Sequence, residues 1–174
     1  QMPYHANTTT GGVVYSSPIW ETKVLAEQWE TDAAGYGPAS DQTAATNEGA
    51  TYRSITPLDI AIGKYERLLL NYRVHWSQNT TGRIKFKLDT PTVTSINTAF
   101  TGVDPNGASM HVCNAAADPV NEVDVAGTIG YLDINCVIEN GATAGTVSLQ
   151  FGQVANNAAP AIVLEGTHVE IKKF

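Results

Sequence analysis

The chain has 174 residues, of which 43% are hydrophobic and 16% are charged, and its formal net charge is −7. This length and apolar content predict one globular domain and exclude an unfolded chain. The acidic balance argues against nucleic-acid binding, which needs a clustered positive surface. No apolar run approaches the length of a membrane helix, and the first residues lack the regions of a signal peptide. We therefore expect neither a nucleic-acid nor a membrane partner.

The first part of the chain, residues 1–50, is interpreted as an N-terminal arm and loop region. Residues 1–17 are mostly small and polar and predict an extended arm. This arm is either an unstructured terminus or a segment that orders against a neighbouring subunit. Tyr4, Val14 and Tyr15 would give such a segment apolar side chains to bury.

Residues 19–29 predict either a short helix or two short strands. A helix would place Trp20 and Trp29 on one stripe, but the segment is too short for periodicity to decide. Residues 30–49 are rich in Gly, Ala, Ser, Asp and Thr, which predicts a loop. A loop of this length is uncommon inside a compact domain, so we interpret it as an exposed contact loop.

The strand pattern becomes clear in residues 51–174, which we interpret as one β-domain. Residues 65–76 and 83–89 each alternate between apolar and polar side chains. Because a polar, Gly-containing loop separates them, we expect the two segments to pair as a hairpin. The side chains expected to face inward are Leu68, Leu70, Tyr72, Val74 and Trp76 in the first segment and Ile84, Phe86 and Leu88 in the second.

Further strands are expected after this hairpin. Residues 92–100 and 109–113 flank the sequence Asp-Pro-Asn-Gly at 104–107, which is typical of a tight turn. Residues 123–138 predict one long strand region, in which Cys136 alternates with apolar side chains and should be buried.

The end of the chain holds the last predicted strands. A strand follows the small-residue turn at 141–145, and Gly166 predicts a bend between the runs at 162–164 and 168–174. About eight strands in all, with no long helix, predict an all-β fold, either an antiparallel sandwich or a barrel.

The sequence offers little for catalysis or metal binding. Its four histidines lie far apart and form no close ligand pair, and there is no nucleophile elbow. Asp118, Glu122, Asp124 and Asp133 are interpreted as solvated acids rather than a glycosidase pair. We therefore expect no catalytic residue, no cofactor and no metal, and predict that the protein is not an enzyme.

Two alternatives stay open at this point. A disulfide between Cys113 and Cys136 is possible, but their spacing does not require it. A cupin-like metal site would need His75 to meet Glu66 and Glu170 on adjacent strands, and nothing in the spacing asks for that arrangement.

The segments GRIKFKLDTP and GTIGYLDINCVIENGATAGTVSLQFGQVANNAAPAIVLEGTHVEIKKF resemble a family of tailed-bacteriophage virion proteins. Its members share a Lys/Phe-alternating strand that ends in Pro, and a C-terminal stretch that begins GATAG. Gln150 and Gln153 stand at the family's glutamine positions, whereas Phe151 stands where the pattern often has Trp. The resemblance covers residues 51–174.

This resemblance implies a small jelly-roll domain that assembles as a homotrimer. Such domains occur as capsid decoration (cement) proteins, as head fibres and at tail-fibre tips. Because no collagen-like or coiled-coil shaft precedes the domain, we expect a decoration protein. It would bind the major capsid protein on the outside of the virion after synthesis in the host cytoplasm. The alternative is a receptor-binding tip domain of a tail fibre.

A set of contact residues is expected to serve this assembly. The outward basic row on an acidic protein is either an ordinary solvated strand face or a contact with acidic groups of the capsid or of a neighbouring protomer. The full set is Tyr4, Val14, Tyr15, Trp20, Trp29, Phe174 and the basic row Arg83, Lys85 and Lys87.

Overall fold

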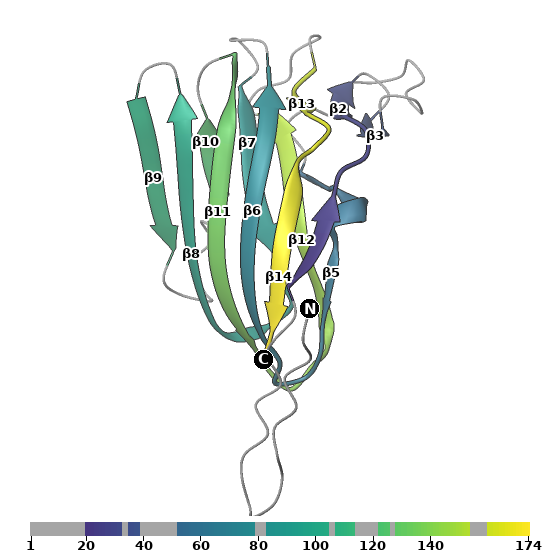
Figure 1. Cartoon of the computed structure of the whole chain (residues 1–174), viewed down its shortest axis with the longest axis vertical. Coiled ribbons are helices and arrows are strands. Elements are labelled where there is room, and N and C mark those ends of the chain that lie inside the picture. The colour runs from purple at the N-terminus through teal and green to yellow at the C-terminus, as the bar shows by residue number, and fades with distance from the viewer. Residues whose placement is uncertain are drawn as a thin grey trace, which may run out of the picture.

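The computed structural model describes residues 20–32, 35–38, 52–78, 83–104, 107–113, 122–125, 128–153 and 160–174. These residues form two antiparallel sheets that pack face to face (Figure 1). A short 3-10 turn, η2 (Thr56–Leu58), interrupts the strands. The predicted all-β, antiparallel sandwich is therefore confirmed.

The larger sheet holds nine strands and the smaller sheet five. The strands of the larger sheet are β1 (Glu21–Val24), β2 (Trp29–Asp32), β3 (Gly35–Pro38), β6 (Arg67–Ser77), β8 (Val93–Asp104), β9 (Gly107–Cys113), β11 (Ile129–Asn140), β13 (Ile162–Val163) and β14 (His168–Lys173). The strands of the smaller sheet are β4 (Arg53–Ser54), β5 (Ile60–Ile62), β7 (Ile84–Asp89), β10 (Glu122–Val125) and β12 (Gly145–Gln153).

The order of these strands is that of a jelly roll. In the larger sheet the order β1-β14-β6-β11 faces β10-β7-β12 in the smaller sheet, with β4 and β5 both paired to β12. The chain crosses between the sheets as it passes from β5 to β6, from β6 to β7 and from β11 to β12. This alternation produces two Greek keys around one core. The β8–β9 hairpin extends the larger sheet beyond β11, and β3, β2 and β13 extend it on the other side of β6, so the strand count exceeds the predicted eight.

The predicted hairpin between residues 65–76 and 83–89 is wrong. The strands exist, as β6 and β7, but β6 pairs with β11 and β14 whereas β7 pairs with β10 and β12. Each strand has one apolar face, and these two faces meet across the interior instead of lying side by side in one sheet. The loop between them therefore connects two layers.

Three other expectations are refined. The 19–29 segment forms no helix and holds one strand, β1, and the first residue of β2, whereas β2 and β3 pair where a loop was predicted. The region 123–138 is divided into β10 and β11, which lie in different sheets. The strands on either side of the 104–107 turn do pair, as expected, with Asp104 opposite Gly107.

The sandwich also begins before residue 51, the predicted start of the β-domain. β1 pairs with β14 and β2 pairs with β13, so both strands belong to the larger sheet. The expected arm, residues 1–17, lies outside the described residues.

The core lies between the two sheets and is built from the inward-facing positions that the alternation predicted. The largest fully buried side chains are Trp76, Phe86, Phe100 and Phe151. Full burial of one such side chain is worth about 1.5–3 kcal/mol. The Cys136 thiol is buried and not disulfide-bonded, with its Sγ 3.1 Å from Thr98 Oγ1, so the bridge to Cys113 that the sequence left open does not form.

The turns between sheets are held by side-chain hydrogen bonds and by glycine. Asn140, buried at the end of β11, donates from Nδ2 to the carbonyls of Gly63 (2.6 Å) and Thr143 (2.8 Å). Gly166 has a φ of +80°, the left-handed conformation that favours glycine, and forms the predicted bend before β14.

No helix among the described residues has the length and apolar character needed to span a membrane.

Candidate functional site

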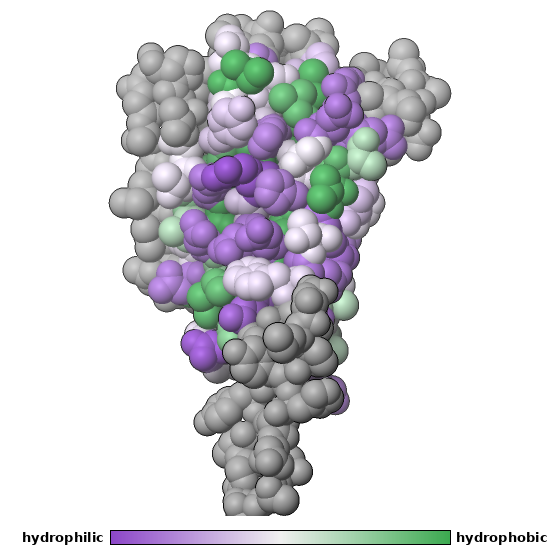
Figure 2. Space-filling view, viewed as in Figure 1, coloured by the Kyte–Doolittle hydropathy of each residue, from purple (hydrophilic) through white to green (hydrophobic). Residues whose placement is uncertain are grey.

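The outer face of the larger sheet presents polar side chains in rows that run across three neighbouring strands. Successive residues of a strand point to opposite faces, and the even-numbered residues of β6 and β11 fill the core. The odd-numbered residues therefore face outward. Figure 2 shows that hydrophilic residues dominate the middle of this face. The two central rows, read from β14 across β6 to β11, are His168–Arg73–Asp133 and Glu170–Asn71–Asn135.

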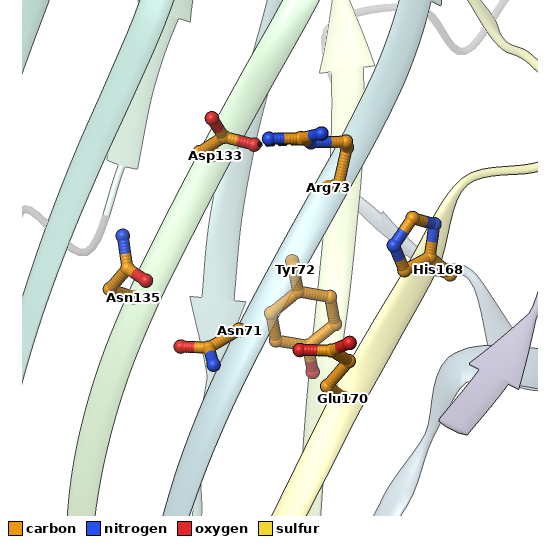
Figure 3. A pocket seen from close by; sticks show the side chains of 7 residues that line it. All are labelled: Asn71, Tyr72, Arg73, Asp133, Asn135, His168 and Glu170. Atoms are coloured by element: carbon orange, nitrogen blue, oxygen red, sulfur yellow. Dashed lines mark hydrogen bonds and ion pairs between the residues drawn. The ribbon is translucent and has the colours of Figure 1, made fainter.

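A hollow of about 370 Å³ lies over these two rows, and we call it the outer pocket (Figure 3). It is lined by Asn71, Tyr72, Arg73, Asp133, Asn135, His168 and Glu170. Tyr72 differs from the others because its side chain is buried in the core, on the opposite face of β6. Burial there raises the pKa of its phenol, with smaller contributions from Cys136 and Asp59, so the phenol stays neutral.

An ion pair fixes one side of the outer pocket. Arg73 Nε donates to Asp133 Oδ1 across 3.0 Å, and this hydrogen bond raises the pKa of the guanidinium further. Both side chains are well exposed, so the pair adds little to stability. Its effect is to orient the guanidinium, whose other N–H groups remain donors for a ligand.

The imidazole of His168 is oriented by the turn that precedes β14. Its Nδ1 lies 3.0 Å from the carbonyl oxygen of Gly166. A carbonyl can only accept, so Nδ1 carries the proton. In the neutral ring the other nitrogen, Nε2, is then an acceptor.

The second row supplies groups whose side chains have no partner in the part of the chain that the structure describes. Within the described ranges, the side-chain amides of Asn71 and Asn135 make no hydrogen bond and Glu170 makes no ion pair. Each amide offers both donors and acceptors, and the carboxylate offers acceptors only. The row therefore presents both kinds of hydrogen-bonding group to the solvent.

An aromatic pair borders the outer pocket in the next row along the strands. The rings of His75 and Tyr131 meet edge to face, with centroids 4.6 Å apart and planes at 80°. Burial lowers the pKa of His75, and the neighbouring His168 and Arg73 lower it further while Asp133 opposes them. Tyr131 is 56% exposed, so its ring is accessible beside the pocket.

The arrangement is suited to hydrogen bonding rather than to metal coordination. In the part of the chain that the structure describes, no three metal-ligating side chains come together. Glu66 directly precedes β6 and His75 lies near its other end, roughly 30 Å away at about 3.3 Å per residue, so they do not share a site. The Glu66 carboxylate is instead bonded to the Gly63 amide and lies 3.6 Å from Lys173 Nζ.

The predicted contact residues are distributed over several places. Tyr4, Val14 and Tyr15 lie outside the described residues. Trp29 is only 6% exposed and belongs to the core of the protomer, so we leave it out of any contact surface. Trp20 is accessible at the edge of the larger sheet, as its 43% exposure shows.

Trp20 lies close to the C-terminal residue through a shared cation. Lys172 Nζ is 5.5 Å from the centroid of the Trp20 ring and 5.3 Å from that of Phe174, which is 63% exposed. Val24 is exposed further along the same edge strand, β1. We call Trp20, Val24 and Phe174 the edge patch.

The basic row lies on the other sheet. Arg83 is exposed, and Lys85 and Lys87 are half-buried on β7. Lys85 Nζ lies 4.2 Å from the centroid of the Tyr52 ring, and Lys87 Nζ lies 5.9 Å from it. Cation–π contacts of this kind hold a lysine stem in place while its charge stays near the surface.

The residues of the outer pocket were not predicted as a site. The sequence does place each of them on a polar strand face, but it does not give the pairing of β6 with β11 and β14. That pairing brings together residues that lie up to about one hundred positions apart in the chain.

No family model and no curated protein matches the chain. A chain of the "Structure of infectious bursal disease virus Gt strain" is similar at 11% sequence identity with a TM-score of 0.23, over 98% of this chain. This chain spans 40% of the length of that one. A likeness this weak supports no argument about function.

Proposed function

We propose that this chain is a structural virion protein, a homotrimeric decoration protein that binds the outer surface of a capsid and stabilises the shell. The observation that carries the proposal is the edge patch on a jelly roll. Trp20, Val24 and Phe174 expose apolar side chains along one edge of the larger sheet. The rings of Trp20 and Phe174 lie together over Lys172 Nζ, and exposed aromatic side chains that lie together are typical of protein contact surfaces.

The edge patch is suited to contact between protomers. A threefold ring uses heterologous contacts, so the patch of one protomer would meet a different surface of the next. Strand β1 also pairs with β14 alone among the described strands, so its other edge makes no strand pairing there. Three such contacts close the ring.

The basic row is suited to contact with the capsid. It lies on the smaller sheet, away from the edge patch, so both contacts can form at once. Arg83, Lys85 and Lys87 would meet acidic groups of the shell. These charge contacts would determine the orientation of the bound protein more than its affinity. A protein that binds only the assembled shell shifts it away from disassembly by mass action. The resemblance of residues 51–174 to phage virion proteins supports the same role.

The direct test is to bind the purified chain to emptied capsids of the phage that carries it. We expect saturation at a fixed ratio to the major capsid protein, and a shell that withstands higher temperature when decorated. The triple variant Arg83→Gln, Lys85→Gln, Lys87→Gln should bind more slowly and with a weaker salt dependence. Failure of the wild-type chain to bind these capsids would contradict the proposal.

A second candidate is the receptor-binding tip of a tail fibre, and the outer pocket favours it because its polar lining is suited to a cell-surface ligand. The two candidates differ in one experiment. A tip domain should bind host cells and block phage adsorption, whereas a decoration protein should leave adsorption unchanged.

A further inference from the structure

We infer that the outer pocket is a binding site for a neutral saccharide. The inference goes beyond the proposed function and does not depend on whether the protein sits on a head or a tail. It rests on the side chains that face the hollow, three of which, Asn71, Asn135 and Glu170, have no side-chain partner among the described residues.

The hydrogen-bonding groups of the outer pocket match those of a sugar ring. Neighbouring hydroxyl groups of a sugar each donate and accept, so a site needs both kinds of partner close together. Asn71 and Asn135 lie opposite each other on β6 and β11 with their amides unpaired within the described chain, and Glu170 lies beside Asn71 on β14. In Figure 3 these three side chains stand on neighbouring strands, with Asn71 and Glu170 side by side.

The opposite side of the pocket is held in a fixed geometry before any ligand binds. Asp133 orients the Arg73 guanidinium, and Gly166 orients the His168 ring. Groups positioned in advance lose less conformational freedom on binding, which favours affinity. All of the polar side chains stand on strands rather than on loops, so the spacing between them is set by the sheet.

The charge of the pocket selects against acidic ligands. Asp133 balances Arg73, and Glu170 adds a further negative charge with no ion-pair partner among the described residues. A carboxylate or phosphate on the ligand would therefore meet a net negative surface. A neutral sugar avoids this repulsion and still uses the acceptors of Glu170.

The volume of the outer pocket and the aromatic ring of Tyr131 beside it also suit a sugar. A volume of about 370 Å³ lies within the usual range of small-molecule sites, about 300–1,000 Å³. Such sites are commonly more apolar than this one, and a polar lining points to a hydroxyl-rich ligand. The exposed Tyr131 ring, two residues before Asp133 on the same face of β11, offers a surface for the apolar face of a sugar.

The test is an NMR titration of the ¹⁵N-labelled full chain. The probes are the methyl glycosides of glucose, galactose, mannose and N-acetylglucosamine, with lactose, maltose and sialyllactose. We expect at least one neutral probe at millimolar concentration to shift the amide signals of β6, β11 and β14 around the pocket. We expect sialyllactose to bind more weakly than lactose.

Substitutions in the outer pocket test whether the saccharide binds there. Asn71→Ala, Asn135→Ala and Glu170→Gln should each weaken binding by about tenfold, since each removes one or more hydrogen bonds to the ligand. Asn97→Ala is the matched control, because Asn97 is exposed on β8 of the same sheet but does not line the pocket. The inference is overturned if no neutral probe shifts these signals, if sialyllactose binds best, or if Asn97→Ala weakens binding as much as Asn71→Ala does.

Discussion

The side chain of Phe86 is fully buried between the two sheets, so removing it leaves a cavity that the rigid strands around it cannot close. We expect Phe86→Ala to lower the free energy of unfolding by about 3–5 kcal/mol, measured by urea denaturation. The control is Ile129→Ala, whose side chain is 62% exposed, and its effect should stay within about 0.5 kcal/mol. Equal losses in the two variants would contradict the position of Phe86 in the core.

His75 gives the fold a specific dependence on pH. Its pKa is lowered, first by burial and then by His168 and Arg73, against the opposing charge of Asp133. The unfolded chain, with an ordinary pKa of about 6.5, therefore binds a proton more readily than the folded chain. The contribution of this shift to the free energy of unfolding is fully present above the unfolded pKa of about 6.5. It is lost as the pH falls through the lower pKa of the folded protein.

The prediction for His75 is checked by following its imidazole signal in an NMR titration of the folded protein. The midpoint should lie below the ordinary value of about 6.5. In His75→Asn, unfolding measured at pH 7.5 and at pH 5 should show a smaller loss of stability on acidification than in the wild type. A midpoint at or above the ordinary value would show that burial does not control this ring.

At the scale of elements, the turn from β11 to β12 depends on Asn140. Its buried amide donates to two backbone carbonyls, those of Gly63 and Thr143, and so ties together the turns at one end of the sandwich. Asn140→Asp replaces these donors by a carboxylate that faces the same carbonyls. We expect a loss of roughly 3 kcal/mol in the free energy of unfolding.

The matched control for this turn is Asn97→Asp, the same substitution at an exposed position on β8. Its effect on the urea midpoint should be small. If Asn140→Asp unfolds at the same urea concentration as Asn97→Asp, the amide does not hold the turn.

The position of most strands was predictable, because a strand with one buried face shows alternating apolar and polar residues in its sequence. Leu68, Leu70 and Val74 were expected in the core and are there. The partner of each strand was not predictable, because an apolar face fits equally well beside a neighbour in one sheet or across the interior. This is why β6 and β7 were wrongly paired.

The outer pocket could not be predicted from the sequence for the same reason. The polar alternation of β6, β11 and β14 shows that Asn71, Asn135 and Glu170 are on solvent faces. Only the register, which places Asn71 opposite Asn135 and Glu170 beside it, brings them into one hollow. Register depends on long-range pairing, and a single residue of slip would turn each side chain to the other face.

At the scale of the whole molecule, the edge patch is expected to drive assembly. Trp20→Ser combined with Phe174→Ser removes two exposed aromatic side chains and should shift the protein from trimer towards single protomers, as measured by sedimentation velocity. Neither side chain is in the core, so the fold should persist in circular dichroism. The control Ile129→Ser alters an exposed residue at the other end of the sheet and should leave assembly unchanged.

The most direct test of a protein that acts by assembly is its mass in solution. The protomer has a mass of 18.5 kDa. Multi-angle light scattering of the purified full chain at micromolar concentration should give a mass of three protomers across the whole elution peak. A uniform peak at the mass of one protomer would contradict the account, because a monomer forms no threefold contact with a capsid or at a fibre tip.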